Sequence, residues 1–161
     1  MTAPAPISFR PEGRSMHPFI RPGDLVTVRP PDGAAAGGIR RGDCVVFRDR
    51  DSRWLVHRVI GGPDGSGRFR TKGDALPGPD HAVERNSVAG VVTIVERRGS
   101  DRRYRLDRKR NRRLGRLIAV LSEFEAAVVS AFPVRRFSGG GKIFDRLVKS
   151  PRWTLTRIFF P

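Results

Sequence analysis

Residues 54–71, WLVHRVIGGPDGSGRFRT, contain two short apolar segments separated by a loop rich in glycine. The first segment, WLVHRVI (54–60), is rich in β-branched and aromatic residues, and the second, RFRT (68–71), alternates basic residues with Phe and Thr. Both patterns are typical of β-strands. The intervening GGPDGSG (61–67) combines glycine, proline and aspartate, as turns between antiparallel strands do. The stretch therefore predicts a β-hairpin.

Short apolar runs between turn residues continue on both sides of this hairpin. Further strands are predicted at LVTV (25–28), CVVF (44–47) and VAGVVTIVE (88–96), with a turn and an edge strand within residues 97–106. PPDGAAAGG (30–38) predicts a flexible loop. Because strands dominate without regular helix alternation, residues 1–106 are predicted to form a mainly β domain, either a folded sheet or a small barrel.

The sequence changes character after Asp107. Apolar residues then recur at helical spacing, which predicts an amphipathic helix. This apolar stripe comprises Leu114, Leu117, Ile118, Leu121, Phe124, Val128 and Phe132. FSGGG (137–141) interrupts the pattern, and KIFDRLVK (142–149) predicts a second short helix. Residues 107–161 are therefore predicted to form a helical C-terminal extension.

The charge of the chain is concentrated in this extension. The 161 residues carry a net charge of +16, of which +5 lies in residues 1–100 and +11 in residues 101–161. Such a basic segment implies an anionic partner, either nucleic acid, phospholipid headgroups or an acidic protein. Two arrangements remain open, because an amphipathic basic helix can pack on the β domain or lie on an anionic membrane surface.

Several classes of site are not expected. Cys44 is the only cysteine, so no internal disulfide can form, and its apolar surroundings predict a small buried hydrophobe. Three scattered histidines do not have the spacing of a zinc site, and no metal or cofactor is expected.

The sequence has no apolar run long enough to span a bilayer and no leader-like start. A cytoplasmic protein, or one peripheral to a membrane, is therefore predicted.

Three sequence features supply the parts of a nucleophilic site. Ser15 lies in GRSMHPFIRPGD (13–24), a stretch dense in turn residues, and His57 interrupts an apolar strand. Asp74 and Asp80 lie in the polar segment TKGDALPGPD that follows the hairpin. A serine hydroxyl needs a neighbouring base, and a carboxylate that orients that base, to act as a nucleophile at neutral pH. The alternative is a structural role, in which Ser15 belongs to a surface turn and His57 is a core residue.

Five segments, in this order, resemble the signal peptidase I family: GRSMHPFIRPGD, RRGDCVVF, LVHRVIG, TKGD with an aspartate six residues later, and VAGVV. The resemblance covers residues 13–92 and implies that Ser15 is the nucleophile. It places His57 where many bacterial members have a lysine base and where archaeal and endoplasmic-reticulum members have histidine. Asp80 is then the third member of the triad, and Asp74 is a reserve or a structural turn residue.

The same resemblance implies how a substrate would bind. The N–H group of Ser15 and turn amides around Gly13 and Arg14 are the candidates for the oxyanion hole. Met16 and Phe19 either shape a pocket for a small side chain before the scissile bond or fill the core. Lys72, within TKGD, lies in the wrong segment for the lysine-type enzymes and is interpreted as a structural or substrate-facing cation.

The chain departs from the family in one respect, and this leaves three functions open. Family members normally have a membrane-spanning helix before the serine, whereas the fourteen residues before Ser15 predict none, which puts an exported preprotein substrate in doubt. The first hypothesis is a serine endopeptidase acting on a peptide or protein. The second is a LexA-like self-cleaving regulator, although such proteins use a lysine base. The third is a non-catalytic basic scaffold that binds an anionic membrane or nucleic acid, of which nucleic acid is less favoured because aromatic residues do not alternate with the arginines.

Overall fold

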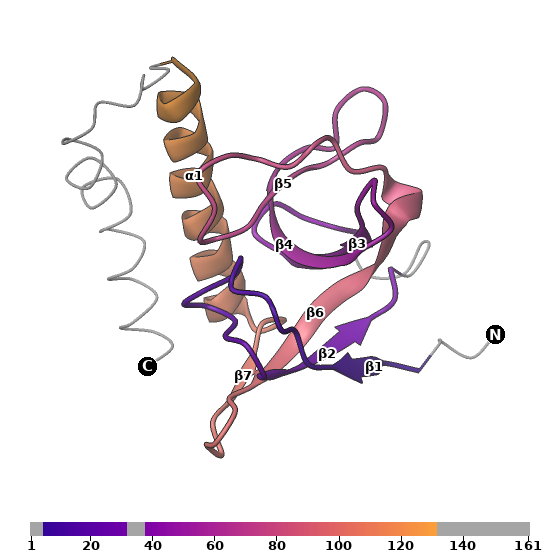
Figure 1. Cartoon of the computed structure of the whole chain (residues 1–161), viewed down its shortest axis with the longest axis vertical. Coiled ribbons are helices and arrows are strands. Elements are labelled where there is room, and N and C mark those ends of the chain that lie inside the picture. The colour runs from indigo at the N-terminus through magenta and orange to yellow at the C-terminus, as the bar shows by residue number, and fades with distance from the viewer. Residues whose placement is uncertain (1–4, 32–37, 132–161) are drawn as a thin grey trace.

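A computed structural model describes residues 5–31 and 38–131 of the chain. The predicted second helix at 142–149 and the end of the apolar stripe, Phe132, lie outside the described residues, as does most of the predicted loop at 30–38. The described residues form a seven-stranded antiparallel sheet followed by one helix (Figure 1). The mainly β character expected from the sequence is therefore confirmed.

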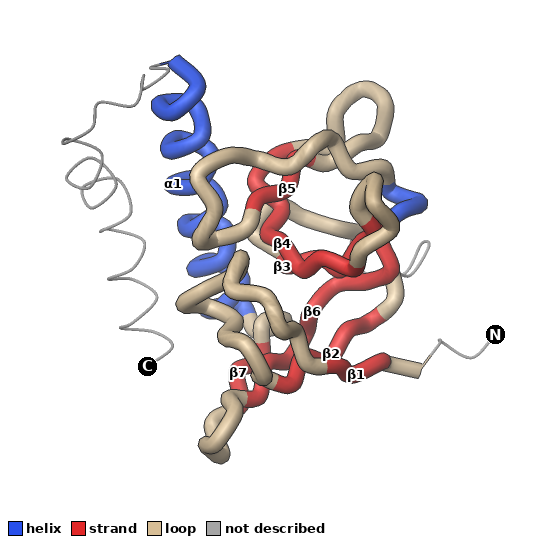
Figure 2. Tube along the Cα trace, viewed as in Figure 1, coloured by secondary structure: helices blue, strands red, loops and turns tan. Residues whose placement is uncertain are grey.

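The order of the strands in the sheet is β1-β2-β6-β3-β4-β5, and β7 pairs with β6. The strands are β1 (Ile7–Phe9), β2 (Leu25–Arg29), β3 (Cys44–Arg48), β4 (Trp54–Gly61), β5 (Arg70–Lys72), β6 (Val88–Glu96) and β7 (Arg103–Arg105). Among the described strands, the two at the ends of this order, β1 and β5, do not pair with each other, so the sheet is folded and open rather than a closed barrel. Figure 2 shows that a long loop and one short helical turn connect β5 to β6.

Strand β6 joins the two halves of the sheet. Its first residues pair with β3 and its later residues pair with β2 and β7. A side chain at Gly90 would begin 2.5 Å from the carbonyl oxygen of Arg29, so only glycine permits this close approach of β2 and β6. The predicted bounds of this strand, 88–96, are those observed.

The sheet buries side chains on both of its faces. Along β3, Cys44 and Val46 contribute to one hydrophobic cluster, whereas Val45 and Phe47 contribute to the other. Successive residues of a strand point to opposite faces, so a strand that is covered on both sides is apolar throughout. This explains why CVVF is an uninterrupted apolar run.

Helix α1 (Lys109–Ala131) packs against the first of these clusters, beside β4. Leu114 and Ile118 are buried there, but Leu117 and Phe124, which the predicted stripe included, are 45% and 70% exposed. These two residues of the predicted stripe therefore do not face the sheet, which the helix also contacts through small and charged side chains. These additional buried residues are Gly115, Ala119, Ser122, Glu125 and Ala126. Within the described part of the chain, no helix has both the length and the apolar character needed to cross a membrane.

Candidate active site

Ser15 lies in a hydrogen-bonded turn between β1 and β2. The turn is closed by the His17 N–H, which donates to the carbonyl of Arg14 at 3.0 Å. The carbonyl of Ser15 accepts a hydrogen bond from the Ala75 N–H at 2.7 Å. The backbone of the serine turn is therefore fixed to the loop that follows β5, and the Ser15 side chain is half-buried.

The two Gly-Asp pairs of RPGD and RRGD are turn residues. Asp24 accepts the N–H of Arg21 at 2.8 Å, and Asp43 accepts the N–H of Arg40 at 2.9 Å. Such carboxylate caps fix the chain as it enters a strand. Burial raises the pKa of the Asp43 carboxyl group. These aspartates therefore position β2 and β3.

His57 and Arg58 are consecutive residues of β4 and have different partners. His57 contacts the ring of Phe47 edge-on, with the ring centroids 6.0 Å apart, on the side of the second hydrophobic cluster. Arg58 lies over the ring of Phe19, which belongs to the first cluster, and bonds the carbonyl of Gly42. The alternation of the strand therefore separates a histidine face from an arginine face.

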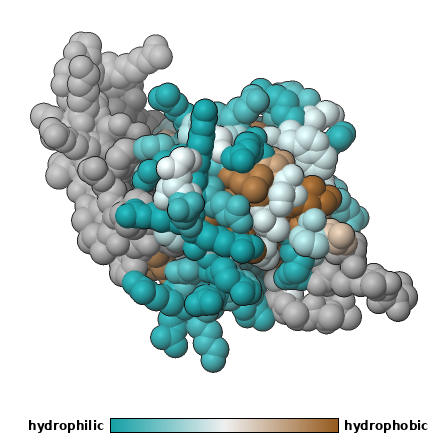
Figure 3. Space-filling view, turned by 90° about the horizontal axis from the view of Figure 1, so that it is seen from below, coloured by the Kyte–Doolittle hydropathy of each residue, from teal (hydrophilic) through white to brown (hydrophobic). Residues whose placement is uncertain are grey.

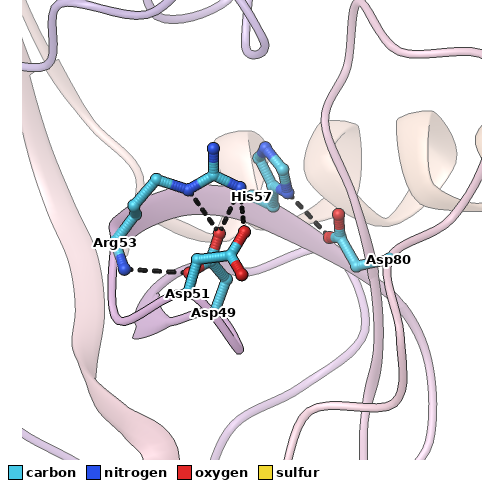
Figure 4. Close-up of polar contacts among 5 residues, drawn as sticks. All are labelled: Asp49, Asp51, Arg53, His57 and Asp80. Atoms are coloured by element: carbon cyan, nitrogen blue, oxygen red, sulfur yellow. Dashed lines mark hydrogen bonds and ion pairs between the residues drawn. The ribbon is translucent and has the colours of Figure 1, made fainter.

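The His57 side chain is hydrogen-bonded to Asp80, 23 residues later in the chain. His57 Nδ1 lies 2.7 Å from Asp80 Oδ2, and the histidine side chain is 3% exposed (Figure 4). When Nδ1 carries the proton and donates a hydrogen bond to the carboxylate, Nε2 has the free lone pair of a general base. The structure therefore brings together the histidine and the aspartate that the sequence proposed as a pair.

Ser15, His57 and Asp80 line one cleft, with a volume of about 1110 Å³. Gly13 and Arg14, proposed to be near the oxyanion, line it as well. No hydrogen bond joins the Ser15 hydroxyl to His57, because His57 Nε2 is buried without any hydrogen-bond partner. Catalytic hydrogen bonds are often long in enzymes without substrate and shorten when substrate binds. Nε2 is thus the one polar atom of the histidine that is left for a further partner.

The walls of the cleft are apolar in one part and charged in another. Its apolar lining consists of Phe47, Leu55, Leu76 and Val83. The turn between β3 and β4 contributes a charged cluster, in which Arg53 bonds both Asp49 and Asp51 (Figure 4). The cleft therefore combines apolar and charged side chains.

Asp74, the reserve candidate for the triad, has a different partner. Its two carboxylate oxygens accept hydrogen bonds from Arg58 Nε and Nη2 at 2.9 and 2.7 Å, and both side chains are buried. This bidentate pair lies on the arginine face of β4. The reserve role is therefore corrected to the structural alternative, because Arg58 engages both oxygens of Asp74 and His57 is bonded to Asp80.

Met16 and Phe19 are core residues. They are 3% and 4% exposed and belong to the first hydrophobic cluster. Neither lines the cleft that contains Ser15 and His57. The structure therefore supports the second of the two expectations, that Met16 and Phe19 fill the core, because both side chains pack into the first hydrophobic cluster.

Lys72 is buried and ion-paired. Its Nζ atom lies 3.0 Å from Glu125 Oε2 on α1, and its side chain is fully excluded from solvent. Lys72 therefore has the structural role that the sequence left open. A Ser–Lys pair between Lys72 and Ser15 would require the lysine to leave a buried carboxylate on the opposite face of the sheet.

Three residues that hold β5 and the loop after it in place were not identified from the sequence. Thr71 bonds Asp80, and Glu125 pairs with Lys72. A side chain at Gly73 would begin 2.8 Å from the carbonyl oxygen of Ser15, so this glycine allows the two loops to meet. The TKGD segment was the signal for two of them, but the partners lie up to 53 residues away and only the fold identifies them.

A second cavity, of about 470 Å³, lies between the sheet and the start of α1. Cys44 and Arg58 line it. Burial raises the pKa of the Cys44 thiol to about 12, so the thiolate is scarce at neutral pH. The cavity therefore has no activated nucleophile among its lining residues, and the cleft with Ser15 is the better candidate site.

Comparison with known proteins finds no matching family, no matching curated protein and no matching solved structure. The function of the site is therefore inferred from its residues and their geometry. In the described ranges, no group of three His, Cys, Asp or Glu side chains could hold a metal ion. His17 is half-buried in the serine turn, where burial and neighbouring arginines lower its pKa, and His81 is an exposed residue at the edge of the cleft.

Proposed function

We propose that this protein is a serine endopeptidase of the signal peptidase I-like and LexA-like type. The observation that carries the proposal is a buried His57 whose Nδ1 is bonded to Asp80 and whose Nε2 has no partner in the cleft that Ser15 lines. In a serine peptidase, the carboxylate fixes the tautomer of the histidine and stabilises the imidazolium that forms. Ser15 is the nucleophile, His57 the general base and Asp80 the orienting group.

The proposed reaction has two stages. Ser15 Oγ attacks the carbonyl carbon of the scissile amide while His57 Nε2 accepts the hydroxyl proton, and the tetrahedral intermediate forms. His57 then donates that proton to the leaving amine, the C–N bond breaks and an acyl-Ser15 ester remains. Water, deprotonated by His57, attacks the ester, and collapse of the second intermediate returns the proton to Ser15 and releases the carboxylate product.

Backbone amides at the serine turn complete the proposed site. Gly13, Arg14 and Ser15 line the cleft, so their N–H groups are the candidates to bind the negative oxygen of the intermediate. A single preorganised donor of this kind contributes about 3–4 kcal/mol to transition-state stabilisation in serine peptidases. The substrate is a peptide or protein segment, and the family resemblance leads us to expect alanine or glycine before the cut.

A peptide library digested by the purified protein and read by mass spectrometry tests this function. The wild type is expected to cut a subset of peptides at one type of site, and Ser15→Ala is expected to cut none. Ser87→Ala is the matched control, because Ser87 is a second serine that lines the same cleft and has no role in the proposed reaction. Cleavage by Ser15→Ala equal to that by the wild type would overturn the proposal. Cleavage of the chain by itself, lost in Ser15→Ala, would favour the LexA-like alternative.

We infer a second function, contact with an anionic membrane, from the outward face of α1. Leu117, Val120 and Phe124 are exposed on this helix, and Arg113 and Arg116 are exposed nearby. An apolar helix face beside basic residues is suited to the headgroup region, where each basic residue contributes about 1 kcal/mol. The inner face of α1 packs on the sheet, so both arrangements considered from the sequence can hold together. Figure 3 shows that hydrophilic side chains also dominate the described surface at the end of the molecule where β7 lies.

Sedimentation with vesicles tests the membrane contact. Phosphatidylglycerol vesicles are expected to bind the protein and phosphatidylcholine vesicles are not. Phe124→Ser is expected to weaken binding several-fold, and Trp54→Ser is the control, because Trp54 is also an exposed aromatic residue but lies on β4. Equal binding of both lipids, or binding of nucleic acid in preference to vesicles, would contradict this inference.

A further inference from the structure

We infer that Thr71 is a positioning residue for the proposed reaction, which it serves by holding Asp80 in the orientation that His57 needs. The inference rests on the proposed function and adds a fourth residue to the catalytic arrangement. Thr71 is fully buried and is absent from the lining of the cleft. It therefore acts through Asp80 and does not touch the substrate.

Two hydrogen bonds join Thr71 to Asp80. Thr71 Oγ1 donates to Asp80 Oδ2 at 2.7 Å, and the Asp80 N–H donates to the Thr71 carbonyl at 2.8 Å. The first bond ends on the carboxylate oxygen that His57 Nδ1 also contacts, at 2.7 Å. Oδ2 thus has one donor from the threonine and one from the histidine, and the carboxylate cannot rotate without breaking both bonds.

The position of Thr71 itself is fixed by its neighbours in β5. Thr71 pairs with Val59 in β4, the strand that also carries His57. The residues before and after it, Arg70 and Lys72, are both ion-paired to carboxylates of α1. Helix α1 therefore clamps the strand on either side of Thr71, and the same hairpin carries the threonine and the histidine that bind Asp80.

The loop that carries Asp80 has few other constraints near this residue. Gly78 has open space around it, and residues 76–79 are half-buried or exposed. A loop of this kind samples several conformations unless specific bonds hold it. The hydroxyl of Thr71 selects the conformation in which Oδ2 faces His57, whereas the backbone bond alone fixes only the main chain.

The test compares Thr71→Val, Thr71→Ser and the wild type in peptide hydrolysis and in NMR of the histidine ring. Valine keeps the shape of threonine and removes the donor, and serine keeps the donor. We expect kcat to fall about ten- to hundredfold in Thr71→Val, the worth of one hydrogen bond to a charged group, with KM within twofold of wild type. Thr71→Ser is expected to restore most of kcat. Thr93→Val is the matched control, because Thr93 loses a hydroxyl bond to the Thr27 carbonyl away from this cleft.

The NMR arm is independent of peptidase activity. The Nδ1 proton of His57, assigned by its absence in His57→Gln, is expected as a far-downfield resonance in the wild type and Thr71→Ser. In Thr71→Val it is expected to broaden or vanish, because the carboxylate turns away and the proton exchanges with water. An unchanged resonance together with an unchanged kcat would overturn the role of Thr71. An inactive wild type that still shows the resonance, lost in Thr71→Val, would overturn the peptidase proposal, and Thr71 would then orient the His57–Asp80 pair without a part in peptide hydrolysis. Thr71→Ala removes the same donor with less bulk and carries the same expectation if the valine variant does not fold.

Discussion

The two faces of the β4–β5 hairpin use the same kinds of residues for different purposes. On the face toward α1, Arg58 binds Asp74 and Lys72 binds Glu125. On the face toward the cleft, His57 and Thr71 bind Asp80. The partners alternate along the strands, with His57 next to Arg58 and Thr71 next to Lys72. Two aspartates from one loop are thus divided between the face toward α1 and the face toward the cleft.

The difference between the faces lies in which polar atoms are left unpaired. Arg58 bonds both oxygens of Asp74 and the carbonyl of Gly42, so this pair is buried and satisfied. The His57–Asp80 pair leaves Nε2 without a partner beside a cleft. A buried, satisfied ion pair fixes a particular arrangement of the chain, whereas a histidine with one unpaired ring nitrogen can still accept a proton. The predictions below separate these two roles.

The largest effect is expected from Asp80→Asn, on catalysis. The amide cannot fix the reactive tautomer of His57 or stabilise the imidazolium, and the corresponding change in triad enzymes costs about 10⁴ in kcat. Peptide hydrolysis measured under saturating substrate checks this value, with thermal unfolding as the test of fold. Asp51→Asn is the control, since Asp51 lines the same cleft but bonds Arg53. A loss below tenfold would remove Asp80 from the catalytic set.

On the opposite face, Asp74→Asn is expected to affect stability. It leaves the buried Arg58 guanidinium without its counter-charge, and breaking a buried pair in this way costs about 3–5 kcal/mol in the free energy of unfolding. Urea denaturation measures the loss, and the molecules that remain folded are expected to keep their activity. The double variant Arg58→Met with Asp74→Leu removes both charges and is expected to recover most of the stability. Loss of activity in Asp74→Asn without loss of stability would reverse the two assignments.

A smaller effect is expected where α1 meets the sheet. In Gly115→Ala the added Cβ would lie 2.8 Å from the carbonyl oxygen of Gly42, which forces the helix away from the turn that precedes β3. We expect the free energy of unfolding to fall by about 1–3 kcal/mol, as in overpacked cores. At an unobstructed helical site the same change would instead stabilise by about 1 kcal/mol. Gly65→Ala is the control, because nothing lies within 4 Å of its added Cβ. An increase in stability in Gly115→Ala would contradict this close contact.

The smallest effect concerns Cys44, which lies at the start of β3. A pKa raised to about 12 means that at pH 8 the thiolate is a very small fraction of the thiol, and the side chain is also buried. A thiol reagent is therefore expected to modify Cys44 only as fast as the protein opens. Urea, which increases the population of open molecules, should increase the rate strongly. Rapid modification of the native protein would contradict this burial.

The strands could be predicted because each carries its own local signal. Turn residues and apolar runs identified β2, β3, β4 and β6, and β6 has the predicted bounds. β1 was missed because three residues give too short a pattern, and β5 begins at Arg70 because Phe69 forms only an isolated bridge to Val83. The apolar pattern alone did not identify all the residues of α1 that face the sheet. It could not reveal, for example, that Glu125 would pair with a buried Lys72 of β5.

For the candidate site too, the sequence predicted some features and left others open. The sequence proposed Ser15, His57 and Asp80 as one set, and the structure lines one cleft with all three. It left open whether Asp74 or Asp80 was the partner of His57 and whether Met16 and Phe19 faced a substrate. These choices depend on which side of a strand or turn a side chain occupies, and one residue of register reverses that side.

The sequence by itself determined a β-rich domain followed by a basic amphipathic helix, because turn chemistry and hydrophobic period are local properties. Only the tertiary structure decided which carboxylate faces the histidine and which neutralises a buried arginine. It also brought Glu125 to Lys72 and Thr71 to Asp80. The pairing of Lys72 with Glu125 joins residues 53 positions apart. Both pairings follow from how the strands, the loop after β5 and the helix pack, which no local pattern encodes.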